Sequence, residues 1–87
     1  MKILPDYMLD LRGVIIPFAL LKISQKFHEI KVSETIEILL NDPDTKKDVF
    51  KILPPFSYKL IELNNEGTFC RIRLKKRAEN WYQDNFP

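Results

Sequence analysis

The chain has 87 residues, of which 45% are hydrophobic and 30% are charged, the composition of a folded, water-soluble domain. This composition excludes a disordered or fibrous protein, and a chain of this size has room for one sheet and one layer of helices. Fourteen basic and twelve acidic residues give a net charge of +2. The sequence lacks the concentrated basic stripe of a dedicated nucleic-acid binder.

Cysteine and histidine each occur once, as Cys70 and His28. This excludes an intramolecular disulfide and a zinc site of spaced Cys and His residues. No apolar run approaches the roughly 18 residues of a membrane span. The first ten residues mix Lys2 with two acidic residues, unlike a signal peptide. We therefore expect a reduced, cytoplasmic protein without metal, cofactor or membrane contact.

The first predicted elements are a strand and a helix. Residues 7–12 alternate between apolar and more polar side chains, which is typical of a half-buried strand, and Gly13 ends the pattern. Pro17 suits the first turn of a helix predicted over 17–27, because its missing N–H is not needed there. Four apolar residues spaced by four, three and four positions would share one face of this helix: Ile16, Leu20, Ile23 and Phe27.

A second strand and a second helix follow. Residues 35–40 alternate and are rich in β-branched residues, which favours a strand. Asp42 is predicted to cap the next helix, with Pro43 at its first position and Asp44 near the positive end of its dipole. Pro54 and Pro55 would end it. The residues expected to be buried are Val49, Ile52 and Leu53.

The last two predicted strands, 58–63 and 69–75, form a hairpin around Asn64-Asn65-Glu66-Gly67. In the second strand, Cys70, Ile72 and Leu74 would face the helices, with Phe69, Arg71, Arg73 and Lys75 on the outer face. The order β-α-β-α-β-β predicts an α/β (α+β) two-layer sandwich, with a four-stranded mixed sheet and two helices on one face.

Two motifs carry a family resemblance. Leu9-Asp10-Leu11-Arg12-Gly13, followed after three intervening residues by Pro17, resembles the first motif of the TusA (SirA-like) sulfur-carrier family: Leu-Asp, a short spacer, Gly, two residues and Cys-Pro-x-Pro. Asp42-Pro43, followed after four intervening residues by Asp48-Val49, resembles the second, an Asp-Pro and then an Asp-Ile at a similar spacing. The resemblance covers roughly residues 8–76. We expect a TusA-like domain over 1–76 and an aromatic extension over 77–87.

The resemblance implies a sulfur relay in which the cysteine before the first helix carries a persulfide between proteins. At that position this chain has Ile16, which can neither ionise nor hold sulfur. The resemblance therefore implies no catalytic residue here and a non-catalytic role: binding another protein, as an accessory or regulatory subunit of a sulfur-handling or redox system. The partner-binding residues carried over by position are Gly13, Ile15, Ile16, Pro17 and Phe18.

Alternative interpretations remain open. Residues 14–18 could form a docking patch or extra core packing. Cys70 could carry sulfur itself, although its inward position predicts a buried, inert thiol. A nucleotide or flavin could bind near three lysines of the predicted helices, Lys22, Lys46 and Lys47, but no glycine-rich phosphate loop supports this.

Other polar groups have simpler structural explanations. His28 is predicted to face solvent at a helix end. Asp42, Asp44 and Asp48 suit the start of a helix better than a metal site. The basic run 75–77 reads as a solvated strand end.

The extension contains Trp81, Tyr82 and Phe86 among polar residues. These aromatic side chains could close over the outer face of the sheet or pack on a second copy or a partner, so a homo-oligomer is possible. On the outer face, the alternation places Met8, Thr35, Glu37, Phe69 and Arg71. We expect Trp81 to be buried there.

Overall fold

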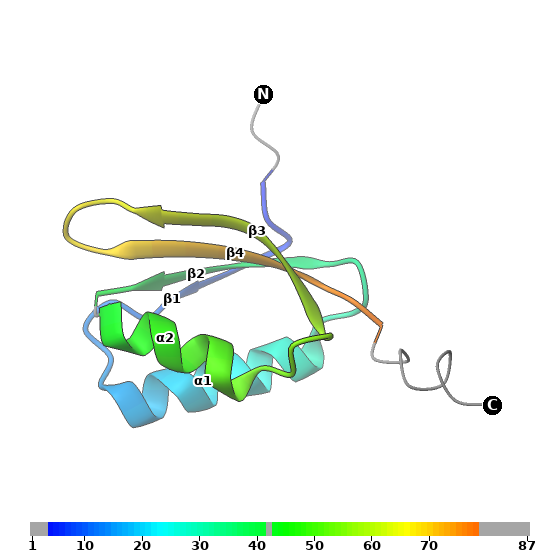
Figure 1. The fold of residues 1–87 in the computed structure, drawn as a ribbon, viewed down its shortest axis with the longest axis horizontal. Coiled ribbons are helices and arrows are strands. Elements are labelled where there is room, and N and C mark those ends of the chain that lie inside the picture. Colours follow the sequence, from blue (N-terminus) through cyan, green and yellow to red (C-terminus); the bar gives the residue numbers. More distant parts are fainter. Residues whose placement is uncertain (1–3, 42, 79–87) are drawn as a thin grey trace.

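The computed structural model describes residues 4–41 and 43–78. Their elements, in chain order, are β1 (Tyr7–Asp10), α1 (Ile16–Glu29), β2 (Thr35–Leu40), α2 (Pro43–Ile52), β3 (Tyr58–Asn65) and β4 (Cys70–Lys76). Both helices lie on the same side of the sheet (Figure 1). The predicted two-layer sandwich of β-α-β-α-β-β order is confirmed. The expected cap at Asp42 and the tail beyond Ala78 lie outside the described residues.

The four strands form one mixed sheet in the order β1-β2-β4-β3. β1 runs parallel to β2, as the intervening helix requires, and the β3–β4 hairpin adds two antiparallel neighbours. This order makes β2 and β4 the central strands. Their inward side chains face one another in register, with Ile36 opposite Leu74 and Ile38 opposite Ile72, and all four are fully buried.

The helices cover this surface with apolar residues spaced by four positions. α1 contributes Ala19, Ile23 and Phe27, α2 contributes Val49, and Leu53 follows directly after α2. The prediction that Ile52 is buried was wrong, because its side chain is 39% exposed. Ile52 is the last residue of α2 and lies on the side of the helix that faces away from the core. Ile16, placed on the buried face of α1 by its spacing, is 37% exposed because it begins the helix.

The outer face of the sheet holds a buried carboxylate that the alternation placed on an open surface. Glu37 is 1% exposed. Its Oε1 accepts a hydrogen bond from Arg73 Nη2 at 2.9 Å and lies 3.7 Å from Arg71 Nη1. The register sets Glu37 directly opposite Arg73, so the long guanidinium side chains cover the acid.

The end of β4 binds the end of α1. Lys76 Nζ donates to the carbonyl oxygens of Phe27 at 2.7 Å, Ile30 at 2.9 Å and His28 at 3.3 Å. A cation at this end complements the helix dipole and satisfies carbonyls that lack helical partners. The sequence analysis predicted that the basic run 75–77 is solvated. For Lys76 this was wrong, because its ammonium group binds the end of α1. His28 is exposed, as expected.

Candidate functional site

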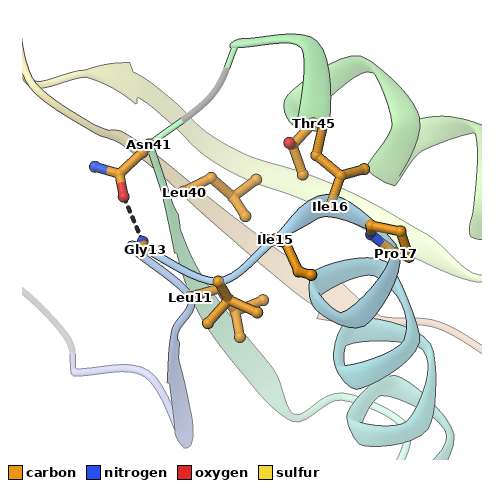
Figure 2. A pocket seen from close by; sticks show the side chains of 9 residues that line it. Leu11, Gly13, Ile15, Ile16, Pro17, Leu40, Asn41 and Thr45 are labelled. Atoms are coloured by element: carbon orange, nitrogen blue, oxygen red, sulfur yellow. Dashed lines mark hydrogen bonds between the residues drawn. The ribbon is translucent and has the colours of Figure 1, made fainter.

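The start of α1 borders a surface hollow of about 470 Å3, here called the α1 hollow (Figure 2). Its walls come from the loop after β1, the first turn of α1, the end of β2 and the start of α2. Nine residues line it: Leu11, Gly13, Val14, Ile15, Ile16, Pro17, Leu40, Asn41 and Thr45. Four of the five positions carried over from the family motif thus meet in one hollow, and Phe18 does not line it.

The loop that forms one wall is held by an asparagine. The Gly13 N–H donates to Asn41 Oδ1 at 2.6 Å, and Asn41 Nδ2 donates to the Thr68 carbonyl at 3.2 Å. Gly13 has φ of +83°, a conformation that glycine adopts without a steric cost. Asn41 therefore connects the loop to the tip of the β3–β4 hairpin. Sequence reasoning missed this role; the available signal was an asparagine directly after a buried strand.

An exposed ion pair stiffens the same loop. The Asp10 carboxylate accepts hydrogen bonds from Arg12 Nε at 2.9 Å, from Nη2 at 2.7 Å and from the Arg12 backbone N–H at 3.1 Å. These bonds favour the ionised acid and lower the pKa of Asp10 from its usual 3.8 to about 2. The Arg12 guanidinium lies 5.0 Å from the centre of the Phe69 ring. Asp10 and Arg12 thus hold the turn that leads into the hollow.

The apolar run 14–18 divides between core and surface. Val14 is partly buried against the core, whereas Ile15 is 63% exposed and Phe18 is 56% exposed. Leu21, one turn beyond Phe18, is 54% exposed and continues the apolar surface along α1. The core-packing interpretation is therefore confirmed for Val14, whereas Ile15 and Phe18 form an exposed apolar surface beside the α1 hollow. That this surface docks a partner stays a prediction.

The chemistry of the α1 hollow is that of a binding surface. None of the nine lining residues is ionisable, and Thr45, which has the one hydroxyl among them, is 3% exposed. No side chain caps α1, and its first turn contains no acidic residue. Ile16 extends from α1 near Thr45 of α2 (Figure 2). The arrangement can receive an apolar side chain; it offers no group for proton transfer.

Cys70 is a free, buried thiol, 5% exposed, at the start of β4. In the ladder it lies opposite Leu40, which lines the α1 hollow. Cys70 is therefore paired across the sheet with a wall residue and does not itself line the hollow.

The remaining candidate groups do not form a second site. Lys22, Lys46 and Lys47 do not line the α1 hollow. Within residues 4–41 and 43–78, no cluster of His, Cys, Asp and Glu could hold a metal ion. Asp48, at 3.9 Å from Lys51, forms an exposed pair along α2. No helix in the described part of the chain is long and apolar enough to cross a membrane.

Comparison with known proteins gives consistent matches. The profile of the family "Sulfurtransferase TusA" matches residues 7–76. The chain is 28% identical to a "Putative sulfur carrier protein" of Archaeoglobus fulgidus over 67 residues, which are 77% of this chain and 92% of the relative. It is 29% identical to the sulfur carrier protein TusA of Buchnera aphidicola over 68 residues, 78% of this chain and 86% of the relative.

A solved structure supports the fold. The SirA-like protein of Desulfitobacterium hafniense superposes with a TM-score of 0.68 at 11% identity, covering 83% of this chain and 99% of that protein. At this identity the likeness concerns the fold alone.

Proposed function

The chain belongs to the sulfurtransferase TusA family, and from that premise we propose that it serves a sulfur-handling or redox system by binding another protein, without carrying sulfur. The observation that supports this proposal most is Ile16. By its place in the motif it replaces the sulfur-carrying cysteine, and it lines an apolar hollow beside exposed Ile15 and Phe18.

The expected interaction is burial of this apolar surface by the partner. Full burial of an Ile or Phe side chain contributes about 1.5–3 kcal/mol, so covering side chains that are roughly half exposed contributes about 1 kcal/mol each. A partner side chain that fills the α1 hollow would add a comparable amount. Such a cluster provides the apolar centre of an interface, with the polar Asn41 at its rim.

The first test concerns the chemistry. Incubation with a cysteine desulfurase and labelled cysteine should leave the wild-type chain without bound sulfur, whereas Ile16→Cys places a thiol at the first residue of α1 and should retain label. Ile16→Ser controls for loss of the isoleucine alone. Label on the wild-type chain would contradict a non-carrier role.

The second test concerns the surface. Proteins that co-purify with the native chain should be lost in Phe18→Asp and Ile15→Asp. Val32→Asp is the matched control, since Val32 is 53% exposed but belongs neither to the lining of the hollow nor to the apolar run 14–18. Equal loss of the same partner in all three variants would show that the hollow and the adjoining apolar run are not the binding surface.

One observation favours a second function, sulfur carriage on Cys70. The relatives are described as sulfur carriers, and the single thiol lies opposite Leu40 of the hollow wall. An opening of the wall would be needed to expose it. Rapid alkylation of Cys70 in the native protein, together with label that disappears in Cys70→Ser, would establish this function in place of the first.

A further inference from the structure

β3 lies at an edge of the sheet, and apolar side chains along it are left uncovered. The strand order places β3 beyond β4, so its far edge has no partner strand within residues 4–41 and 43–78 (Figure 1). Leu60 and Leu63 lie opposite fully buried residues of β4 and therefore point to the side of the sheet that carries the helices. Nevertheless, Leu60 is 43% exposed and Leu63 is 42% exposed. The helix layer thus ends before it covers β3.

A β-bulge gives the side chains of β3 a symmetrical pattern of directions. Leu60 and Glu62 lie opposite consecutive residues of β4, so Ile61 is the extra residue. Ile61 lines a hollow of the outer face together with Arg73, and Glu62 shares that face because it lies opposite Arg73. Along Tyr58–Asn65 the side chains therefore point inward, outward, inward, outward, outward, inward, outward and inward. This pattern is identical when it is followed in either direction from the midpoint between Ile61 and Glu62.

Such a pattern fits a second copy of the same strand. A two-fold axis perpendicular to the sheet sets two edge strands antiparallel and keeps every side chain on its own face. With the axis at the midpoint between Ile61 and Glu62, each inward residue of one copy lies opposite an inward residue of the other. We propose that the chain forms a homodimer in which two β3 edges pair antiparallel about this midpoint and join the two sheets into one.

The side chains that would meet on the helix side are uncharged. Each copy contributes four of them: Tyr58, Leu60, Leu63 and Asn65. Leu60 of one copy lies opposite Leu63 of the second copy, and the two-fold axis repeats this pair. Apolar cross-strand pairs of this kind stabilise an antiparallel ladder. The dimer therefore covers the leucines that the helix layer leaves exposed.

The charges on the outer side are complementary. Lys59 lies opposite Asn64 of the second copy and diagonally beside Glu62 of the second copy, within reach of a long side chain. Within its own sheet Lys59 lies opposite Lys75, where like charges destabilise the ladder. The carboxylate of the second copy offsets this repulsion. One lysine and one glutamate from each copy balance along the junction.

The same features discourage other strands. Edge lysines and β-bulges are devices by which proteins prevent pairing with unrelated strands. A regular strand without a bulge would match the faces of β3 on one side of Ile61 only, and it would not bring a carboxylate to Lys59. The second copy satisfies both conditions. This dimer does not depend on the proposed function, and it leaves the α1 hollow of each copy open, because no residue of β3 lines that hollow.

The first experiment measures association of the full-length chain by sedimentation equilibrium. The wild-type protein should form dimers reversibly as its concentration rises. Lys59→Glu should raise the dimer dissociation constant about tenfold, because two attractive pairs become repulsive. The monomer should stay folded, because the new acid lies opposite Lys75 of its own chain. Lys47→Glu makes the same charge change on the exposed face of α2 and should leave the dissociation constant unchanged.

The second experiment tests the register with disulfides in a Cys70→Ser background. Residues 59 and 64 of opposite copies would have Cα atoms about 4.5–5.5 Å apart, a separation that a disulfide spans. Lys59→Cys/Asn64→Cys should therefore give a covalent dimer on mild oxidation. Each single variant should stay monomeric, because residue 59 lies about 15 Å from residue 59 of the second copy. Lys59→Cys/Asn65→Cys is the matched control, since Asn65 points to the other face.

Three results would overturn the inference. The first is a wild-type chain that stays monomeric at every concentration. The second is a dimer whose dissociation constant Lys59→Glu leaves unchanged, because that dimer would form through another surface, such as the aromatic extension. The third is a covalent dimer that forms as readily from the single variants or from Lys59→Cys/Asn65→Cys, because the strands would then lack the proposed register.

Discussion

Replacement of Glu37 should destabilise the protein more than replacement of any exposed charge. The Glu37 side chain is 2% exposed and that of Arg73 is 12% exposed, with Nη2 and Oε1 2.9 Å apart. Glu37→Leu removes the negative charge that faces this largely buried guanidinium. Breaking a buried pair in this way costs about 3–5 kcal/mol, a large share of the roughly 5–15 kcal/mol that stabilises a typical domain.

The other arginine of the cluster should matter less. Arg71 is 26% exposed, lies 3.7 Å from Glu37, and has Glu66 Oε1 at 3.5 Å from its Nε. Arg71→Leu is therefore expected to cost about 1 kcal/mol or less.

The decisive comparison is the double variant Glu37→Leu/Arg73→Leu, which removes both charges and fills the space with apolar atoms. Its stability should lie within about 2 kcal/mol of wild type, well above that of Glu37→Leu alone. Urea denaturation of the wild type, Glu37→Leu, Arg73→Leu and the double variant, followed by circular dichroism, gives the coupling energy of the pair. Additive losses, or a loss below about 1 kcal/mol for Glu37→Leu, would refute the view that the pair is held as a buried unit.

Three further predictions concern the loop and the second helix. Asn41→Ala should lower the free energy of unfolding by about 1–3 kcal/mol, whereas Asn41→Asp keeps the acceptor for the Gly13 N–H and should cost less; equal losses in urea titrations would contradict this role. The pKa of Asp10, measured by carboxyl NMR, should be about 2 and should return towards 3.8 in Arg12→Met. Because this pKa is lowered on folding, the ion pair's stabilisation is present above about pH 4 and is lost as the pH falls towards 2. Asp42→Ala should lower stability by about 0.5–2 kcal/mol if Asp42 caps α2, and an unchanged urea midpoint would exclude that cap.

Local patterns in the sequence are enough to predict the elements and their order. The strand over 35–40 was predicted with its observed bounds, because alternation and β-branched residues act within the segment itself. The hairpin was also confirmed: Gly67 has φ of +91°, and Glu66 N–H donates to the Phe69 carbonyl at 2.8 Å. The motif around Gly13 and Pro17 indicated which loop leads into α1, and hence most of the lining of the α1 hollow.

Tertiary structure decided the features that depend on residues distant in sequence. The burial of Glu37 results from the β2–β4 register, which sets it opposite Arg73. The contacts of Lys76 with α1 and of Asn41 with Gly13 join residues 46 to 49 and 28 positions apart, respectively. Spacing within a helix could not show that Ile16 begins α1 beside a hollow. The spacing of apolar residues identifies which face of a helix is buried. It does not show whether the neighbouring elements extend far enough to cover the first turn of that face.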